Sequence, residues 1–555
     1  MEKPLIVQSD RSILLEVDNP SYHDARDRLS RFAELEKSPE HVHFYRVTPL
    51  SIWNAAAAGM TDDEMVESLV EFSRYEVPRN VQADIRDYVR RYGLVKLEAR
   101  GSEMLLRSDD PYILEEVARN PLTSRYLLGR EDADTLLMDP EYRGHVKQAM
   151  VKIGYPVEDL AGYVQGDFFD VSFRDTCGTG RDFALRPYQV DSVDVFHAGG
   201  SARGGSGVIV LPCGAGKTVV GMGVMSAVKM KTLVLTTSLV AVRQWRDELI
   251  DKTLVDPEDI GEYSGEEKNI RPITLSTYQI LTYRRAKTDP FLHFGIFRDA
   301  NWGLIVYDEV HLLPAPVFRM TAELQATRRL GLTATLIRED GREDEVFSLI
   351  GPKKFDVPWK ILEKQGWIAQ AHCKEVRIRI DEDLRMDYAV ADQRQKFRIG
   401  AENPRKLAVL QQILERHEEG RILVIGQYLD QLKRVQDELK VPLITGKTPN
   451  RDREELYGMF RTGELPLLLV SKVGNFAVDL PGANVLVQIS GTFGSRQEEA
   501  QRLGRILRPK ENGATAHFYS LVTRDTRDQE FAEKRQRFLT EQGYAYEIID
   551  EGALG

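Results

Sequence analysis

The stretch Val208–Leu211, followed at once by Pro212–Thr218 (VIVL-PCGAGKT), decides the fold of this sequence. A short β-branched run predicts a buried strand, and the glycines after it predict a tight turn into a helix. Backbone N–H groups at such a turn, together with the start of the helix, face a bound anion. The stretch therefore predicts a phosphate-binding loop within an α/β domain.

Within this loop, Lys217 is expected to reach the β- and γ-phosphates of ATP, and Thr218 to place its hydroxyl on Mg²⁺. The strict phosphate-loop pattern has glycine where this chain has Leu211. A Gly-rich turn without a nucleotide is the alternative, but the strand before it and the helix after it favour nucleotide binding. The residues expected to line the nucleotide here are Pro212, Cys213, Gly214, Ala215, Gly216, Lys217 and Thr218.

A second apolar run, Leu304–Tyr307, ends in the acidic pair Asp308–Glu309. Carboxylates at the carboxyl end of a strand suit a metal ligand beside a group that orients water. Asp308 is the predicted Mg²⁺ ligand and Glu309 the predicted general base for water attack. In isolation such a pair is usually a solvated turn, but downstream of a phosphate loop the functional interpretation is favoured.

The third signal is QRLGRILR, residues 501–508, in which Arg505 and Arg508 are one helical turn apart. Two guanidinium groups on one face can stabilise charge on the γ-phosphate from across a domain interface. The alternative is a solvated basic helix.

The expected strands fall into two successive sets with helices between them. The first set is Gly207–Leu211, Thr232–Thr236, Ile273–Ser276, Leu304–Tyr307 and Leu330–Leu332. The second set is Ile422–Ile425, Leu443–Thr445, Leu467–Val470, Val485–Ile489 and His517–Leu521. This alternation predicts an α/β fold class with two tandem parallel-sheet lobes and a site at the carboxyl ends of their strands.

The residues before the two lobes have a different sequence pattern. Residues with helical spacing and a capping-box start at Thr61 predict a mostly helical first domain, with one short strand at Ile13–Val17. Short strands alternating with helices then predict a small α+β domain. The predicted domains are residues 1–95, 96–172, 173–365 and 366–548. A charge-rich segment at 381–403 is expected to be an inserted helical element.

Composition excludes several classes of protein. The longest apolar runs fall well short of the roughly 20 residues that a membrane span needs, so no membrane partner is expected. The 3 cysteines are far apart, which predicts neither a disulfide framework nor a zinc site. Residues 1–172 carry 32 acidic and 21 basic side chains, and so hold the whole net charge of −11. A uniformly basic face is therefore not expected, and nucleic acid would be held by local clusters.

The motifs LPCGAGKT, DEVH, GLTAT and QRLGRILR, in this order, resemble those of superfamily 2 helicases. Longer stretches are similar to the XPB family of DNA repair and transcription helicases. They are LRPYQ (185–189), WGLIVYDEVHLLPAPVFR (302–319), LGLTATLIRED (330–340), SKVGNFAVDLP (471–481), SRQEEAQRLGRILR (495–508) and KRQRFLTEQGY (534–544). The resemblance covers about residues 143–548, and the bacterial form of the family also resembles residues 1–95.

This resemblance implies two RecA-like lobes with ATP and Mg²⁺ between them, and 3′-to-5′ movement on single-stranded or forked DNA. It implies repair of the nucleotide excision type or transcription-linked DNA opening. Residues 96–172 take the place of the family's damage-recognition domain, and 381–403 that of a thumb-like element that grips DNA. The long terminal extensions of eukaryotic members are missing. A prokaryotic, cytoplasmic and nucleoid-associated protein is therefore expected.

The resemblance also implies roles for single residues. Gln189 would contact the adenine, with Arg186 nearby, and Gly474 and Asp479 would lie near the sugar or the interface. Thr333 and Thr335 would couple hydrolysis to domain movement. The element Arg338, Glu339 and Asp340 resembles one associated with strand opening.

Two weaker candidates lie between the strong motifs. Ser276 and Thr277 occupy a place where motor domains touch the phosphate backbone, which hydroxyls can do without bulk positive charge. Trp245 either serves the same surface or packs in the core, and both interpretations stay open.

Three alternative functions remain from sequence alone. An RNA helicase would use the same motor, and a double-stranded DNA translocase would step along duplex without displacing a strand. A scaffold that uses ATP only as a switch could recruit a nuclease or another repair protein, although the arginine pair argues against this.

Overall fold

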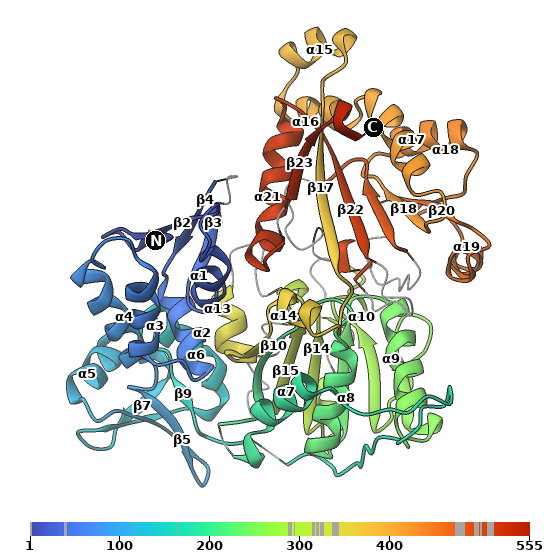
Figure 1. Cartoon of the computed structure of the whole chain (residues 1–555). Helices are drawn as coiled ribbons and strands as arrows, with labels where there is room; N and C mark the ends of the chain where they lie inside the picture. The colour runs from blue at the N-terminus through green and yellow to red at the C-terminus, as the bar shows by residue number, and fades with distance from the viewer. Residues whose placement is uncertain are drawn as a thin grey trace. The chain divides into compact units, whose positions relative to one another are not determined.

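The computed structural model describes the chain apart from residues 1–2, 38–40, 164, 202, 287–290, 294, 314–316, 318–320, 322–326, 336–342, 472–482, 493–498, 500–501, 505, 508–514, 545 and 555. The chain divides into two compact units, whose elements are labelled in Figure 1. The first comprises residues 1–34, 45–211 and 216–357, and the second comprises residues 358–555 with the short segments 35–44 and 212–215. Among the described residues, no helix has the length and apolar character to cross a bilayer.

The N-terminal region combines helices with a sheet. Its helices are α1 (Tyr22–Leu29), α2 (Pro49–Ala57), α3 (Asp62–Phe72) and α4 (Arg79–Arg91). Its strands, in the sheet order β1-β2-β4-β3, are β1 (Leu5–Val7), β2 (Ser12–Glu16), β4 (Val42–Arg46) and β3 (Glu34–Lys37). The predicted capping box is present, since Thr61 and Glu64 bond each other's backbone N–H at the start of α3. The helices were predicted, whereas only one of the four strands was.

The next region has the expected α+β character. Its sheet, in the order β7-β8-β6-β5-β9, comprises β7 (Leu127–Arg130), β8 (Thr135–Met138), β6 (Glu103–Arg107), β5 (Lys96–Arg100) and β9 (Glu158–Asp159). Helices α5 (Pro111–Arg119) and α6 (Arg143–Lys152) bury their apolar residues, including Leu114 and Val146, against it. Asp159 is buried and is stabilised by ion pairs with Arg143 at 2.6 Å and Lys147 at 3.0 Å.

The first lobe is built on a seven-stranded sheet whose neighbouring strands are all parallel. In sheet order its strands are β12 (Ile260–Tyr263), β13 (Ile273–Thr277), β11 (Thr232–Thr236), β14 (Leu304–Asp308), β15 (Arg328–Thr333), β10 (Ser206–Val210) and β16 (Lys353–Asp356). Its helices are α7 (Pro187–His197), α8 (Lys217–Val228), α9 (Leu239–Lys252), α10 (Tyr278–Leu281), α11 (Ile296–Asp299) and α13 (Glu343–Glu345). Every residue of β10, β11 and β13 is buried, as continuous apolar runs in a parallel sheet predict.

The second lobe repeats this architecture, and its seven-stranded sheet is likewise parallel throughout. In sheet order its strands are β19 (Leu443–Ile444), β20 (Leu467–Val470), β18 (Ile422–Ile425), β21 (Val485–Gln488), β22 (Ala516–Thr523), β17 (Ala371–Ile378) and β23 (Tyr546–Asp550). Its helices are α14 (Trp359–Lys364), α15 (Arg385–Val390), α16 (Gln393–Ala401), α17 (Arg405–Arg416), α18 (Leu429–Leu439), α19 (Asn450–Thr462) and α21 (Arg527–Glu541). The predicted fold class, with two tandem parallel-sheet lobes, is confirmed.

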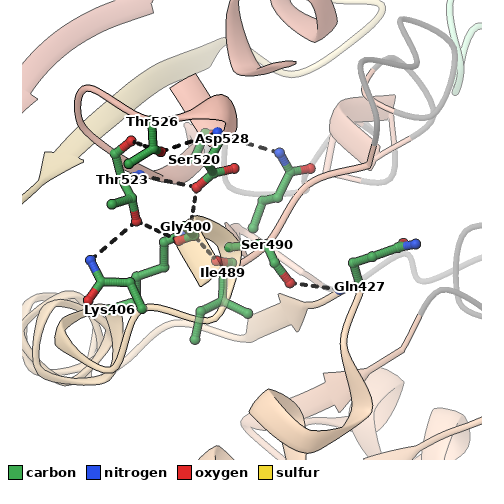
Figure 2. Close-up of polar contacts among 12 residues, drawn as sticks. Gly400, Lys406, Gln427, Ile489, Ser490, Ser520, Thr523, Thr526 and Asp528 are labelled. Carbon is green, nitrogen blue, oxygen red and sulfur yellow. Dashed lines mark hydrogen bonds and ion pairs between the residues drawn. The ribbon is translucent and has the colours of Figure 1, made fainter. Parts of the chain in front are cut away.

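The segment 381–403 holds α15 and α16, and a buried polar cluster joins its end to the sheet of the second lobe (Figure 2). Lys406 Nζ lies 2.7 Å from Asp528 Oδ2 and donates to the carbonyl of Ile489 at 3.1 Å. Thr523 donates its backbone N–H to Asp528 and its hydroxyl to the carbonyl of Gly400, at 3.1 and 2.6 Å. The helical segment is therefore anchored to the carboxyl ends of β21 and β22.

Candidate active site

The strand order of the first lobe brings the sequence motifs together. Strand β15 lies between β10 and β14 (Figure 1). Thr333 of β15 pairs with Val210, and Leu332 pairs with Asp308. The carboxyl ends of these three parallel strands therefore lie side by side along one edge of the sheet, the edge at which its strands end and not an outermost strand. Ligands of open α/β sheets bind outside such an edge.

The predicted phosphate loop turns from β10 into α8 through two glycines in the left-handed backbone region. Gly214 has φ +84° and Gly216 has φ +81°, which side chains rarely tolerate. Gly216 caps α8, so Lys217 and Thr218 occupy the first turn of the helix, where backbone N–H groups lack intrahelical partners. Turns of this kind concentrate N–H groups into an anion-binding concavity.

Gln189 of α7 lies against this loop. A Cβ on Gly216 would come within 2.6 Å of Gln189 Nε2, so the glycine is required for this approach. The amide oxygen of Gln189 accepts a hydrogen bond from the backbone of Arg186 at 2.9 Å, and the Arg186 guanidinium donates to Tyr188 at 3.1 Å. The structure thus places Gln189 beside the predicted phosphate loop, with Arg186 hydrogen-bonded to Gln189 at the start of α7.

The acidic pair lies opposite the loop lysine. Lys217 Nζ is 3.4 Å from Glu309 Oε1, and both side chains are mostly buried. Glu309 has φ +50°, an uncommon left-handed conformation for a residue other than glycine. Such conformations cluster at functional sites, where the surrounding structure holds them.

Burial and charge separate the pKa values of the two carboxyl groups. Burial, aided by the negative charge of Glu309, raises the pKa of Asp308 to about 6. Burial also acts to raise the pKa of Glu309, but the positive charges of Lys217 and His311 outweigh it, and the net pKa is lowered. Glu309 therefore stays ionised at neutral pH, as a general base requires.

The donor set at this edge fits Mg²⁺. Asp308 and Glu309 offer hard carboxylate oxygens, and Glu309 Oε2 accepts no hydrogen bond from the described residues. No cluster of three or more potential metal ligands occurs in the described part of the chain. A magnesium ion bound by one or two carboxylates together with substrate phosphates needs no such cage.

A short chain of polar contacts through His311 links this pair to β15. His311 Nδ1 and Thr333 Oγ1 are 2.7 Å apart, and His311 Nδ1 lies 3.5 Å from Glu309 Oε2. Thr333 in turn donates to the carbonyl of Thr335 at 2.6 Å and accepts its N–H at 3.1 Å. Both threonines proposed to couple hydrolysis to movement are thus joined to the acidic pair through His311.

Ser276 and Thr277 lie at the end of β13 in the same lobe, but both are buried. The Ser276 hydroxyl donates to the carbonyl of Tyr263 at 2.7 Å, and the Thr277 hydroxyl caps α10. In this conformation neither side chain faces solvent, and a direct contact with a nucleic acid phosphate remains a prediction.

Several predicted site residues lie outside the described part of the chain. They are Arg338, Glu339, Asp340, Gly474, Asp479, Arg505 and Arg508. Their neighbour Arg502 is buried and donates to Gln488 Oε1 on β21.

Sequence reasoning missed the contacts that three residues make with the acidic pair. Trp245 is buried and donates its indole N–H to Asp308 Oδ2 at 2.9 Å, and Tyr278 donates its hydroxyl to the Asp308 carbonyl at 2.9 Å. His311 was quoted only as part of its motif. Buried tyrosine and tryptophan need a polar partner, but nothing local in the sequence says which partner it will be.

Comparison with known proteins agrees with this arrangement. Residues 362–553 match the family model described as ERCC3/RAD25/XPB C-terminal helicase. Residues 182–338 match that of the type III restriction enzyme res subunit, and residues 5–132 match a helicase conserved C-terminal domain.

Relatives match almost the full length. The chain is 54% identical to the DNA 3′-5′ helicase XPB of Mycobacterium tuberculosis, covering 99% of this chain and 98% of the relative. It is 52% identical to the protein of the same name from Kineococcus radiotolerans, covering 99% and 96%. It is 35% identical to the putative DNA 3′-5′ helicase Rad25 of Halobacterium salinarum, covering 95% and 84%.

Two parallel-sheet lobes, together with the matches to helicase family models and to named DNA helicases, place the chain in the class of superfamily 2 ATP-dependent helicases. Within this class, the chain belongs to the XPB family.

Proposed function

We propose that this protein hydrolyses ATP at the carboxyl edge of the first-lobe sheet to drive 3′-to-5′ movement along DNA. The observation that carries the proposal is the grouping of Lys217, Glu309 and Asp308 at that edge, with Lys217 3.4 Å from Glu309. The DNA substrate and the polarity come from the names of the relatives, which are DNA 3′-5′ helicases.

The chain's own residues divide the chemistry between them. The phosphate loop and Lys217 bind and orient the phosphates, and ionised Glu309 accepts a proton from the attacking water. Asp308 and Thr218 would hold Mg²⁺, which supplies positive charge to the phosphate oxygens when bound. Arg505 and Arg508 would stabilise the charge that develops on the γ-phosphate.

Other parts of the chain receive roles from the same family membership. Gln189 and Arg186 would select the adenine, Gly474 and Asp479 would lie near the sugar, and Arg338–Asp340 would act at the opening strand. Residues 96–172 would inspect DNA, and the segment 381–403 would grip it. A DNA-bound protein of the prokaryotic cytoplasm, with a nuclease or another repair partner, fits this set of roles.

The test is steady-state ATP hydrolysis by the wild type and Glu309→Gln, alone and with single-stranded DNA, forked DNA or RNA. We expect DNA to stimulate the wild type strongly and the variant to lose hydrolysis by at least about 100-fold, because the amide accepts no proton. Equal rates under all conditions, or a larger stimulation by RNA, would contradict the DNA assignment.

A second candidate is a translocase that moves on duplex DNA without unwinding it. More distant relatives, such as that of Encephalitozoon cuniculi at 32% identity, are named helicase/translocase subunits. Displacement of a triplex-forming oligonucleotide from an otherwise intact duplex, without release of a strand from forked DNA, would favour translocation over unwinding.

A further inference from the structure

The indole of Trp245 is held beside the predicted metal ligand and not in an ordinary part of the core. Its side chain is 1% exposed, so water cannot satisfy its N–H group. The N–H donates to Asp308 Oδ2 at 2.9 Å, although the two residues are 63 positions apart. A buried N–H directed at a buried carboxylate forms a charge-assisted hydrogen bond, which is stronger than one to a neutral acceptor.

The Trp245 ring packs closely against Gly221 of α8. Helix α9 carries the indole against α8 at Gly221, where a Cβ would come within 2.4 Å of Trp245 Cη2. The same Cβ would lie 3.3 Å from Leu332 on β15. The absence of a side chain at position 221 therefore leaves room for the six-membered ring in the position from which the N–H reaches Asp308.

Three hydrogen bonds restrain Asp308. Oδ2 accepts the indole N–H, Oδ1 accepts the backbone N–H of Glu309 at 3.1 Å, and the main-chain carbonyl accepts the Tyr278 hydroxyl. An ionised carboxylate has about four lone-pair sites, so one remains on each oxygen for other partners. The carboxylate is therefore fixed in orientation while it keeps the capacity to bind a cation.

We propose that Trp245 is a positioning residue that orients the Asp308 carboxylate for the magnesium ion of Mg–ATP. Partners that orient a metal ligand typically change metal affinity about 10- to 100-fold when removed. The inference rests on the proposed assignment of Asp308 as the metal ligand. It adds a residue that lies outside the phosphate loop and the acidic motif.

The first test compares Trp245→Phe with Trp302→Phe. Trp302 is also buried in the first lobe and donates its indole N–H to the Ile296 carbonyl at 2.7 Å. It lies just before β14, at the other end of the strand from Asp308 and about 20 Å away. Both variants keep an aromatic ring and lose one buried indole hydrogen bond, so a merely structural effect should be similar in the two.

The readout is the affinity for a fluorescent, non-hydrolysable ATP analogue, measured by anisotropy in Mg²⁺ and in EDTA. For Trp245→Phe we expect affinity in EDTA to match the wild type and the gain from Mg²⁺ to fall about 10-fold. The half-saturating Mg²⁺ concentration for hydrolysis should rise by a similar factor. Trp302→Phe should keep the wild-type response to Mg²⁺ in both measurements.

A second pair of variants leaves both tryptophans in place. Gly221→Ala pushes on the Trp245 ring, whereas Gly223→Ala in the same helix pushes on Val193, with a Cβ 2.7 Å from Val193 Cγ2. We expect Gly221→Ala to lower the gain from Mg²⁺ and Gly223→Ala not to change it. Thermal unfolding of each variant confirms that folded protein is compared.

Asp308→Asn separates failure of this inference from failure of the proposed function. If Asp308→Asn hydrolyses ATP like the wild type, the assignment of Asp308 is wrong and the inference fails with it. If Asp308→Asn is inactive but Trp245→Phe responds to Mg²⁺ as Trp302→Phe does, the role of Trp245 alone is overturned.

Discussion

Lys217 and Glu309, 92 residues apart in the sequence, form one ion pair, with Lys217 Nζ 3.4 Å from Glu309 Oε1. The lysine assigned to the phosphates therefore also keeps the pKa of the assigned general base low. Two functions of the site depend on the same side chain.

Lys217→Ala should abolish hydrolysis, because the variant loses both the phosphate ligand and the charge that keeps Glu309 ionised. We expect a fall of at least about 1,000-fold in DNA-stimulated ATPase activity. The control is Lys229→Ala, at the other end of α8, where the lysine pairs with exposed Asp170. Hydrolysis retained in Lys217→Ala would show that the phosphate-loop assignment is incorrect.

Asp308→Asn should gain stability relative to the wild type as the pH rises from 4.5 to 7.5 in EDTA, and it should abolish magnesium-dependent hydrolysis. The folded pKa of Asp308, about 6, lies above its value of 3.8 in the unfolded chain, so the folded state binds this proton more tightly. The contribution of this group to stability is therefore highest below pH 3.8 and is lost as the pH rises towards 6. The Asn side chain does not titrate, so between pH 4.5 and pH 7.5 we expect the variant to gain on the order of 1–3 kcal/mol relative to the wild type. Its amide can accept only one of the two N–H groups that Asp308 accepts, from Trp245 and Glu309, and this loss is the same at both pH values.

Thermal unfolding of wild type and Asp308→Asn at pH 7.5 and pH 4.5 measures this effect. The Tm of the variant minus that of the wild type should be lower at pH 4.5, where the wild-type carboxyl is mostly neutral in the folded state. Asp170→Asn, on the surface, is the control. If the Tm of Asp308→Asn minus that of the wild type were lower at pH 7.5 than at pH 4.5, the raised pKa of Asp308 in the folded state would be contradicted.

The interior strands of both sheets were predictable because burial on both faces demands continuous apolar runs. Five strands were predicted in each lobe, and each sheet has seven. Strands β12, β16 and β23 lie at sheet edges, where polar residues are tolerated and the apolar pattern weakens. Strand β17 is internal, but its sequence AHCKEVRI carries buried Glu375, which Gln536 bonds at 2.6 Å. The local sequence around Glu375 does not predict that its partner will be Gln536.

Long-range contacts in the candidate site were likewise not predictable from local sequence patterns. The phosphate loop and the acidic pair were predictable because each is a local sequence pattern at a strand end. The bond from Trp245 to Asp308 depends on α9 crossing over the sheet, and the contact of Gln189 with Gly216 depends on the packing of α7. These relationships are set by tertiary structure, and a tryptophan with helical spacing is compatible with ordinary core packing.

Gly400 and Gly458 lie in helices of the second lobe and should respond oppositely to alanine. A Cβ on Gly400 would come within 2.9 Å of Thr526 Oγ1 and 3.3 Å of Asp528 Cβ, so Gly400→Ala should lower stability by about 1–3 kcal/mol. A Cβ on Gly458, in α19, has nothing within 4 Å. Gly458→Ala should therefore raise stability by about 0.5–1 kcal/mol through helix propensity.

Urea unfolding of the two glycine variants gives the comparison directly. Gly400 also supplies the carbonyl that accepts the Thr523 hydroxyl, so its replacement should weaken the attachment of α16 to the sheet (Figure 2). Equal changes in the two variants would mean that the close packing of α16 does not contribute to stability.

Removing one partner of the buried Lys406–Asp528 pair should lower stability more, for each residue changed, than replacing both partners with apolar residues. Both side chains are 0% exposed, and Asp528 Oδ2 also accepts the backbone N–H of Thr523. Removing one partner leaves an uncompensated buried charge, so Lys406→Met or Asp528→Leu alone should lower stability by about 3–5 kcal/mol. The double variant should recover only part of that loss, because it removes the unpaired charge but leaves the Thr523 N–H and the Ile489 carbonyl without the partners that Asp528 and Lys406 supply.

A double-mutant cycle on urea unfolding measures this coupling, and we expect it to exceed about 2 kcal/mol. The control cycle uses the adjacent pair Arg405–Glu551, which is 3.1 Å apart but partly exposed, at 45% and 21%. Solvent screens that pair, so its coupling should stay below about 1 kcal/mol. If the two cycles gave the same coupling, burial would not be the reason that the Lys406–Asp528 pair matters. Each side chain would then contribute separately, through its own hydrogen bond to the backbone, Asp528 with Thr523 and Lys406 with Ile489.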